Sequence, residues 1–522
     1  MTMSRRDMLL QGCVIGAGVI AANTPGIVAL AQAGPKLRRS LHGMAPNDPI
    51  LQTWRDGVRL LKAASGNVSW TSFANIHGNA TDFNLCPHGN WYFLPWHRAY
   101  LVSYERAVRQ LTGNNDFALP YWDWTEDRQM PAAFVQPTFN GQPNSLFESQ
   151  RDATPTDSLP DSTVGPGVIN QILAESPFET FGTSRPINGA QVQNNLDQSW
   201  INCEFCGTMG TLEQTPHNLV HVFVGGIMAQ ANSALDPLFM MHHCNIDRIW
   251  WLWNQGGGAD TPDPLWTGMT FQNNFFNPDG TPYSPKVSDL LVPEPLGYTY
   301  ADTPVTPPPS TTPPTTTPPT TPPPATVAQY DKFKSLYAVP NLATAKPAGV
   351  ATYAAPVTGD AATLNKYLEV GVDVDPNALR TVVYRKSAPS GSETLSLTKA
   401  RQDYISGPRC YAFLREVDYT QHQNTEYRVF LDCDYLSAGV PTSNRHYVGS
   451  FGFFGGHGSH GGKEARKPSI AVDLTAACQR VYGNATTPPG KLRVQIQPVP
   501  LKPTGRAGSA KPSRVEVAIV GA

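Results

Sequence analysis

The sequence has no run of about 18 consecutive apolar residues after its first 33 residues, so we expect a soluble mature chain without a membrane span. It also has no excess of charge of either sign, with 39 Lys and Arg against 41 Asp and Glu. A net charge of -2 gives no basic face for nucleic acid and no strongly acidic face for cationic partners. The composition therefore favours a small-molecule substrate.

The first 33 residues are typical of an export signal. Arg5 and Arg6 precede an apolar stretch over residues 14–22, and Ala-Gln-Ala at 31–33 forms a small-residue cleavage site. The arginine pair favours a twin-arginine signal, which exports proteins already folded, over an ordinary secretory signal. We therefore expect an exported protein, either periplasmic or secreted.

Residues 303–326 are almost wholly Pro and Thr and cannot bury a core, so they predict an extended polyproline linker. This linker separates a predicted catalytic domain (34–302) from a β-rich C-terminal domain (327–522). The latter contains short alternating or β-branched runs, which predict a β-sandwich. The runs lie at 381–384, 427–431, 491–496 and 514–519.

Most of the histidines lie in the catalytic half, where the first notable pair is in the segment HNLVH. His217 and His221 are four residues apart, which places both imidazoles on one face of a helix. A zinc protease requires Glu after the first of these histidines, but Asn218 stands there. Thr215-Pro216 predicts a helix start just before His217, and Asp236-Pro237 predicts another before the adjacent His242 and His243.

A second histidine group lies upstream and contains His77, His88 and His97. His88 and His97 are nine residues apart and would lie on opposite faces of one straight helix, so a break between them is required. Pro95 at a helix start provides it. Two groups of imidazoles without a carboxylate cluster argue against a di-iron site and favour copper, which suits O2 chemistry.

Three segments resemble the type 3 copper family of tyrosinases, catechol oxidases and hemocyanins. HGNWYFLPWHRAYLVSYER resembles the first copper motif of the family, and PHNLVHVFVGG with DPLFMMHHCNIDRIWWLW resembles the second. The resemblance implies a mainly α-helical four-helix-bundle domain that holds two copper ions, with O2 as co-substrate. The implied metal ligands are His77, His88, His97, His217, His221 and His243. Of the adjacent pair, His243 is chosen because the ligand of the family lies one turn before the Asp, here Asp247.

The resemblance also assigns a catalytic role to Glu213 and Asn218. In the family these two residues hold a water molecule that can take the phenol proton, which favours ortho-hydroxylation. An acidic residue near a helix N-terminus is the alternative explanation for Glu213.

Other residues support the implied site. Cys86 is a candidate for a thioether bond to His88, which would account for the odd number of cysteines in the mature chain; a buried thiol is the alternative. Phe93 and Phe239 are expected to pack on imidazole rings. Asn245 and Asp247 are expected to position the ligands and their backbone.

Two short segments outside the copper motifs remain open in their interpretation. Cys203 and Cys206 predict a local disulfide or two free thiols. The Gly-rich segment 455–462 contains two histidines and predicts a mobile hairpin tip rather than a metal site.

The C-terminal half is similar to the C-terminal domain of plant-type polyphenol oxidases. TEYRVFLDCDYL, HYVGSFGFFGG and KPSIAVDLT carry this similarity, and Tyr-Thr-Tyr at 298–300 resembles the element that closes the catalytic domain of the family. The resemblance implies that the C-terminal domain covers the copper site as a lid, and the linker is long enough to let it fold back.

The function that the resemblance implies is that of a tyrosinase. Such an enzyme hydroxylates monophenols and oxidises the resulting catechols to o-quinones, the precursors of melanin. A catechol oxidase without monophenol activity, a hemocyanin-like O2 carrier and a phenol-binding protein without copper are the alternatives.

Overall fold

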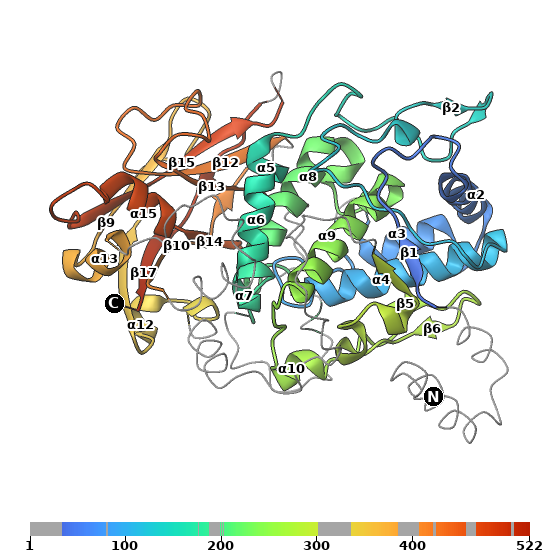
Figure 1. Ribbon diagram of the computed structural model, residues 1–522, viewed down its shortest axis with the longest axis horizontal. Coiled ribbons are helices and arrows are strands. Elements are labelled where there is room, and N and C mark those ends of the chain that lie inside the picture. The colour runs from blue at the N-terminus through green and yellow to red at the C-terminus, as the bar shows by residue number, and fades with distance from the viewer. Residues whose placement is uncertain are drawn as a thin grey trace, which may run out of the picture.

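The computed structural model describes residues 34–79, 82–175, 177–186, 199, 201, 203–300, 336–384, 407–420, 424–455, 466–502 and 506–521. They form a helical unit followed in sequence by a sheet-rich unit, as the ribbon in Figure 1 shows. This confirms the predicted fold class. The predicted signal (1–33) and Pro/Thr linker (303–326) lie outside the described residues.

Long helices with fully buried tryptophans form the core of the helical unit. Helix α4 packs against both α2 and α9, and Trp54, Trp96 and Trp250 from these three helices have no exposed surface. Asp48 caps α2 by accepting from the Ile50 backbone N–H at 2.9 Å. The helices are α2 (Pro49–Ala63), α3 (Trp70–His77), α4 (Phe93–Thr112), α5 (Asp161–Val164), α6 (Pro166–Ala174), α7 (Phe178–Phe181), α8 (Asn218–Val224), α9 (Leu238–Gln255) and α10 (Pro264–Thr267).

Short strands complete the helical unit. β1 pairs in parallel with β7, so the start of the described chain lies beside the Tyr-Thr-Tyr element. The strands are β1 (Lys36–Arg38), β2 (Thr138–Phe139), β3 (Gln142–Pro143), β4 (Thr208–Met209), β5 (Phe275–Phe276), β6 (Pro282–Tyr283) and β7 (Tyr298–Tyr300). None of the helices in the described segments combines the length and the apolarity that a membrane crossing requires.

The sequence predicted three helix starts near the histidines, and the structure confirms two of them. Helix α4 begins at Phe93 with Pro95 in its first turn, so the expected break after His88 is confirmed. Helix α9 begins after Asp236, whose side chain accepts from the Leu238 N–H at 2.8 Å. The third prediction is wrong because the helix has already begun at residue 211, and Thr215-Pro216 lies inside a π-helical turn, η4 (Glu213–His217).

Two larger sheets form the body of the C-terminal unit, beside a short two-stranded pair. One has the strand order β4-β14-β10-β17-β8, and the other has the order β13-β12-β15-β9. Side chains from both sheets meet in one core, which confirms the predicted sandwich. The elements are β8 (Val350–Pro356), β9 (Leu368–Asp373), β10 (Arg409–Arg415), β11 (Asp418–Tyr419), β12 (Thr425–Leu431), β13 (Tyr447–Phe451), β14 (Ser469–Asp473), β15 (Lys491–Pro500), β16 (Ala510–Lys511) and β17 (Arg514–Val520), with helices α12 (Leu342–Ala345), α13 (Pro376–Val383) and α15 (Thr475–Tyr482).

Three of the four predicted strands are confirmed as parts of β12, β15 and β17. The prediction for 381–384 is wrong, because this segment continues or follows helix α13. Asp375 accepts from the Asn377 N–H at 2.8 Å, and Pro376 occupies the first turn. This strong helix start outweighs the strand preference of the β-branched residues that follow.

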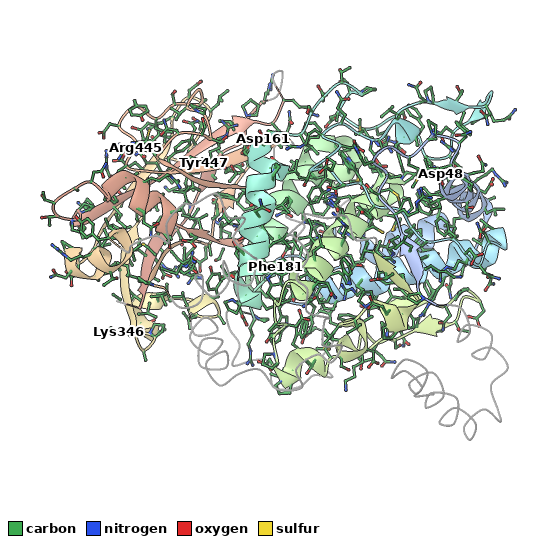
Figure 2. The ribbon with its side chains drawn as sticks, in the orientation of Figure 1. Asp48, Asp161, Phe181, Lys346, Arg445 and Tyr447 are labelled. Carbon is green, nitrogen blue, oxygen red and sulfur yellow. A yellow bond between two sulfur atoms is a disulfide. The ribbon has the colours of Figure 1, made fainter. Side chains whose placement is uncertain are left out.

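The two units share a sheet. β4 from the helical unit pairs in parallel with β14 of the C-terminal unit, with Thr208 opposite Ser469 and Met209 opposite Ile470. In Figure 2, Tyr447 of β13 lies near Asp161 of α5 at the same boundary, where these two elements are in contact. The C-terminal unit therefore packs directly against the helical unit.

Candidate metal centre

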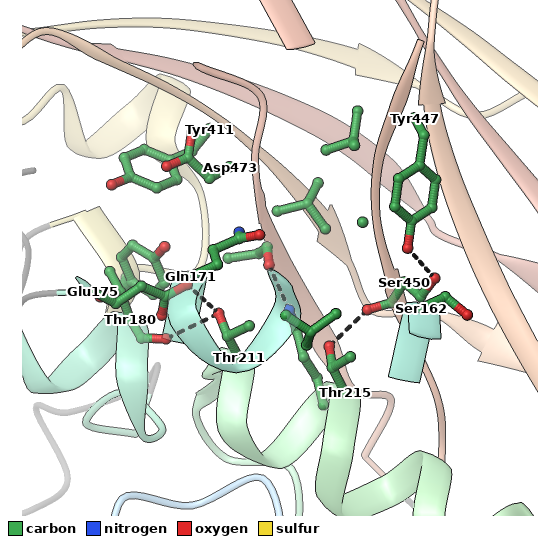
Figure 3. A pocket seen from close by; sticks show the side chains of 17 residues that line it. Ser162, Gln171, Glu175, Thr180, Thr211, Thr215, Tyr411, Tyr447, Ser450 and Asp473 are labelled. Carbon is green, nitrogen blue, oxygen red and sulfur yellow. Dashed lines mark hydrogen bonds between the residues drawn. The ribbon is translucent and has the colours of Figure 1, made fainter. Parts of the chain in front are cut away.

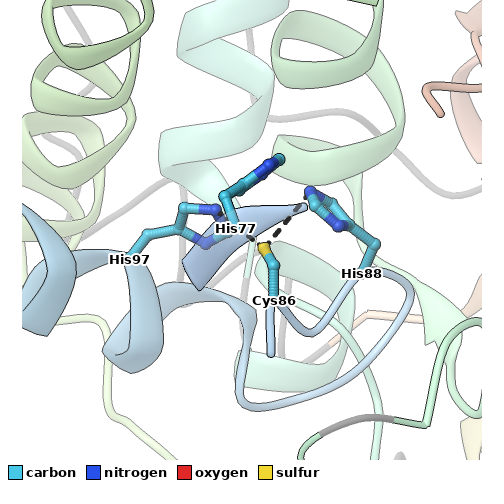
Figure 4. Close-up of side chains that lie close together, drawn as sticks. All are labelled: His77, Cys86, His88 and His97. Atoms are coloured by element: carbon cyan, nitrogen blue, oxygen red, sulfur yellow. Dashed lines mark hydrogen bonds between the residues drawn. The ribbon is translucent and has the colours of Figure 1, made fainter. Parts of the chain in front are cut away.

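The first histidine group is assembled from two helices and the loop between them. His77 ends α3, His97 lies in the first turns of α4, and Cys86 and His88 come from the connecting loop. Figure 4 shows these four side chains close together. One potential ligand atom from each lies within 4.8 Å of the others. All four side chains are buried.

The second group comes from η4, α8 and α9. It contains His217, His221, His242 and His243, with one potential ligand atom from each within 4.8 Å of the others. All four are buried.

The two groups face one another across a short gap. The rings of His97 and His243 are stacked with centroids 4.2 Å apart and an angle of 8° between their planes. His88 and His217 are also stacked, at 5.6 Å and 24°. The structure thus brings all six predicted ligands into one buried cluster.

Hydrogen bonds to backbone carbonyls fix the orientation of three of these rings. Nδ1 donates to a carbonyl oxygen in His77 (Ala231, 2.6 Å), His97 (Phe93, 2.8 Å) and His221 (Met228, 2.7 Å). A carbonyl oxygen only accepts, so the proton of each neutral ring is on Nδ1 and Nε2 keeps its lone pair. This is the arrangement of metal-binding histidines.

The ring nitrogens of the adjacent His242 and His243 have different partners. The Trp124 indole N–H donates to His242 Nδ1 at 3.1 Å. Since an indole N–H only donates, Nδ1 of His242 is the acceptor and its proton is on Nε2. His242 in this tautomer has no Nε2 lone pair for a metal, whereas the Nε2 atom of His243 lies 3.3 Å from that of His221.

Burial keeps the imidazoles neutral. It lowers the pKa of His77 to about 4. Burial and the neighbouring imidazoles hold the pKa of the other histidines of the cluster well below the usual value. Among the described residues, Nε2 of His77, His217 and His242 has no hydrogen-bond partner; in His242 this atom carries the proton, so of the three only His77 and His217 present a free lone pair. Buried, neutral imidazoles with unpartnered Nε2 atoms fit copper as ligands.

Cys86 lies between two imidazoles of the first group. Its Sγ is 3.2 Å from His97 Nε2 and 3.8 Å from His88 Nε2, so the thiol is nearer to His97 than to the predicted partner His88. Burial raises the pKa of Cys86 well above its usual value. The Cys86–His88 thioether stays a prediction.

Glu213 lies at the start of η4 and is fully enclosed. It accepts from the Gly89 backbone N–H at 2.6 Å and from the Thr183 hydroxyl at 2.5 Å. Burial raises the pKa of Glu213 to about 7, although both hydrogen bonds oppose the shift. This carboxyl group can therefore exchange a proton near neutral pH.

Both polar atoms of the Asn218 side chain have partners. Oδ1 accepts from His217 Nδ1 at 2.8 Å, and Nδ2 donates to the Gly452 carbonyl at 2.9 Å. The amide that is predicted to hold a water with Glu213 is therefore bound by the C-terminal unit.

Phe93 and Phe239 both contact the imidazole cluster. The ring centroid of Phe93 lies 4.6 Å from those of His97 and His217. That of Phe239 lies 4.1 Å from His243 and 4.9 Å from His77. Both rings exclude water from the imidazoles.

Asp247 binds charged and phenolic groups below the cluster. It accepts from Arg98 at 2.6 Å, Arg38 at 3.2 Å, Tyr298 at 2.7 Å and Tyr300 at 2.5 Å. Burial alone raises its pKa, but the two guanidinium groups hold the pKa below its usual value. Asp247 thus ties α9 to α4, β1 and β7.

Asn245 has a smaller role in the structure. Its Oδ1 accepts from Arg248 at 3.3 Å, and Arg248 also forms an ion pair with Asp123 at 3.0 Å.

Phe454 of the C-terminal unit covers the cluster. Its ring stacks on His221 at 3.8 Å and 20°. It also lies 5.2 Å from the ring of His88 and 5.6 Å from that of His217. The side chain is 2% exposed, so it fills the space above both histidine groups.

Sequence reasoning did not find Phe454, Trp124 or Thr183, because each acts through a contact distant in sequence. The aromatic pair in the segment SFGFFGG is the only signal that could have indicated Phe454.

Cys203 and Cys206 form the local disulfide that was one of the two expectations. Most of the Gly-rich segment 455–462 lies outside the described residues.

Comparison with known proteins agrees with this site. Residues 67–256 match the family model of the common central domain of tyrosinase. The chain is 33% identical to a tyrosinase of Hahella sp. (strain CCB-MM4) over 289 residues, 51% of this chain and 56% of that protein. It is 30% identical to the chloroplastic catechol oxidase B of Solanum tuberosum over 236 residues, 42% of this chain and 39% of that protein. The chain spans about half the length of the curated relatives it matches.

The whole fold is similar to that of latent apple tyrosinase. The TM-score is 0.59 at 19% identity, with 93% of this chain and 98% of that chain covered. Both histidine groups lie within residues 67–256, the segment that matches the central domain of tyrosinase, and tyrosinases are type 3 copper proteins. The match of this segment and the curated relatives support membership of the tyrosinase and polyphenol oxidase family.

Proposed function

We propose that this protein is a copper-dependent phenol oxidase that uses O2 as co-substrate. The observation that carries the proposal is the pair of facing imidazole groups in which buried Nε2 atoms lack a hydrogen-bond partner among the described residues. The family membership and the curated relatives, a tyrosinase and a catechol oxidase, support the same chemistry.

The proposed metal ligands form two sets. His77, His88 and His97 hold one copper ion, and His217, His221 and His243 hold the other. When bound, the two copper ions supply the redox chemistry with O2. His242 is excluded from the ligand set because Trp124 directs its proton to Nε2.

Glu213 is the proposed proton acceptor for a monophenol. Its pKa of about 7 lets it take the phenol proton through a held water and release it again. The hydroxylation of monophenols, which distinguishes a tyrosinase from a catechol oxidase, depends in this proposal on Glu213 and Asn218.

A catechol oxidase is the second candidate, and one observation favours it. Asn218 Oδ1 accepts from His217, and Asn218 Nδ2 donates to the Gly452 carbonyl and faces Met209 Sδ at 3.7 Å, so in this arrangement the amide is directed at protein groups and not at a water beside Glu213. Oxidation of a diphenol does not require that water. Turnover of L-DOPA without turnover of tyrosine would identify this candidate.

The C-terminal unit is the proposed lid. Phe454 occupies the space over the histidines where the ring of a phenol would lie. A phenol therefore reaches the metal centre only when the C-terminal unit or the segment that carries Phe454 moves away. We further propose that residues 1–33 direct export and that residues 303–326 link the two units.

The proposal is tested by measuring copper per chain together with O2 uptake on tyrosine and on L-DOPA. We expect two copper ions per chain and O2 uptake with at least the diphenol after removal of the Phe454 ring. Zinc, or no metal, in a chain produced with copper available would overturn the oxidase function.

A further inference from the structure

The π-helical turn η4 carries two functional residues, Glu213 at its start and His217 at its end. In this turn the Asn218 N–H bonds to the carbonyls of Glu213 and Thr215 and passes over that of Gln214. π-Helical turns are rare, occur as single turns inside α-helices and are frequent at functional sites. A turn of this kind depends on partners outside the helix for its carbonyl groups.

The C-terminal unit supplies one such partner and accepts two further hydrogen bonds from side chains of the turn. The Gly452 backbone N–H donates to the Gln214 carbonyl at 2.8 Å. The Gln214 side-chain Nε2 donates to the Ala471 carbonyl at 3.0 Å, and the Thr215 hydroxyl donates to the Ser450 carbonyl at 2.7 Å. Figure 3 shows Thr215 pointing at Ser450 across the cavity between the two units, which both side chains line.

Gly452 also reaches the residue that orients a proposed metal ligand. Its carbonyl accepts from Asn218 Nδ2 at 2.9 Å, while Asn218 Oδ1 accepts from His217 Nδ1 at 2.8 Å. A Cβ atom on Gly452 would lie 2.5 Å from Leu219 Cδ2 and 3.0 Å from Leu219 Cγ, so a larger residue here would require the Leu219 side chain to shift.

We propose that residues 450–452, which we call the clamp segment, position η4 and thereby hold His217 and Glu213 in place. The C-terminal unit then has two separable actions at the metal centre: Phe454 covers it, and the clamp segment shapes its second histidine group. Gln214 and Thr215 are positioning residues in this account, since their side chains contact the clamp segment or its neighbouring strand and not the imidazoles. The inference rests on the proposed function for the identity of the metal.

The consequence is a specific loss of one metal ion when the clamp is weakened. Removing a partner that orients a metal ligand lowers metal affinity by about 10- to 100-fold. The first histidine group has no member in η4, so its metal should be retained. Activity alone would not separate this effect from a change in the lid, and metal retention is therefore the measurement.

The experiment uses the full chain with copper bound and compares Thr215→Val with Thr215→Ser and Thr211→Val. Thr215→Val removes the hydroxyl that donates to Ser450, whereas Thr215→Ser keeps it. Thr211→Val is the matched control, because Thr211 lies on the same helix and donates to Glu175 within the helical unit at 2.8 Å. Copper per chain is followed over time during dialysis against a chelator, and thermal unfolding checks that each variant is folded.

We expect Thr215→Val to bind one of its two copper ions more weakly than the wild type, by at most the about 10- to 100-fold in affinity that loss of a direct orienting partner costs, so that this ion is lost first during dialysis and the other is kept. Thr215→Ser and Thr211→Val should behave as the wild type does. Gln214→Met, which lacks the donor to Ala471, gives the same readout if Thr215→Val fails to fold.

Equal retention in the wild type, Thr215→Val and Gln214→Met would overturn the clamp. Equal loss in Thr211→Val would also overturn it, because general loosening of the interface would then explain the effect. A wild-type chain that binds no copper would overturn the proposed function itself, and with it the clamp.

Discussion

The ring of Phe454 stacks on the imidazole of His221 with centroids 3.8 Å apart and 20° between the ring planes. The two residues are separated by more than 200 positions and come from different units of the chain. A phenol that approached the second histidine group would need the same face of His221. In the proposed function, Phe454 therefore occupies the position that the substrate would take.

Removing the Phe454 ring should activate the protein. An aromatic contact of this kind contributes about 0.5–1.5 kcal/mol, so Phe454→Ala should raise O2 uptake on L-DOPA by up to roughly tenfold. Phe453→Ala is the matched control, because Phe453 stacks on Tyr419 within the C-terminal unit at 3.9 Å. Equal rates for Phe454→Ala and wild type, with copper present in both, would refute the lid.

Replacement of the two adjacent histidines should affect copper differently. His243→Gln removes a proposed ligand and should reduce copper from two ions per chain to one. His242→Gln keeps a side-chain acceptor for the Trp124 N–H and should retain both ions, because Trp124 already prevents His242 from acting as a ligand. Atomic absorption measurements on both variants decide this, and the reverse result would move the ligand to His242.

Monophenol turnover should rise with pH through the neutral range. The pKa of Glu213 is raised to about 7, so its carboxyl group is protonated below that pH and ionised above it. Only the ionised form can accept the phenol proton. Initial rates on tyrosine from pH 5.5 to 8.5 in the Phe454→Ala variant measure the rise.

Glu213→Gln provides the control for this pH profile. The variant should lose monophenol turnover and keep much of its diphenol turnover. An unchanged pH profile in Glu213→Gln would show that another group accepts the proton.

Asp247→Asn should destabilise the helical unit strongly. Arg98 would lose its buried counter-charge, and Arg38 would keep only its ion pair with Glu105; removing one partner of a buried pair costs about 3–5 kcal/mol. The midpoint of urea unfolding measures this change. Asp116→Asn is the control, since its pair with Lys36 is exposed and its loss should leave the midpoint unchanged.

Features that depend on nearby residues could be predicted from the sequence. The spacing of His217 and His221, the break at Pro95 and the helix start at Asp236 are local signals, and the structure agrees with each of them. Local signals failed where a stronger feature overrode them. Thr215 has the residue type of a helix cap, but its hydroxyl donates to Ser450 of the C-terminal unit.

Features that depend on distant contacts could not be predicted. The tautomer of His242 is set by Trp124, which lies 118 positions away in the sequence. The pKa of Glu213 follows from its burial beside Gly89 and Thr183, which only the fold brings together. The family resemblance indicated a lid, yet the residue that enters the site became evident only from the contacts of Phe454.

The central claim is a two-copper phenol oxidase centre covered by the C-terminal unit. Copper per chain, measured with O2 uptake on L-DOPA in the wild type and in Phe454→Ala, tests it most directly. The account predicts two copper ions in both proteins and a higher rate in Phe454→Ala. No copper in either protein, or no O2 uptake by the copper-loaded variant, would contradict it.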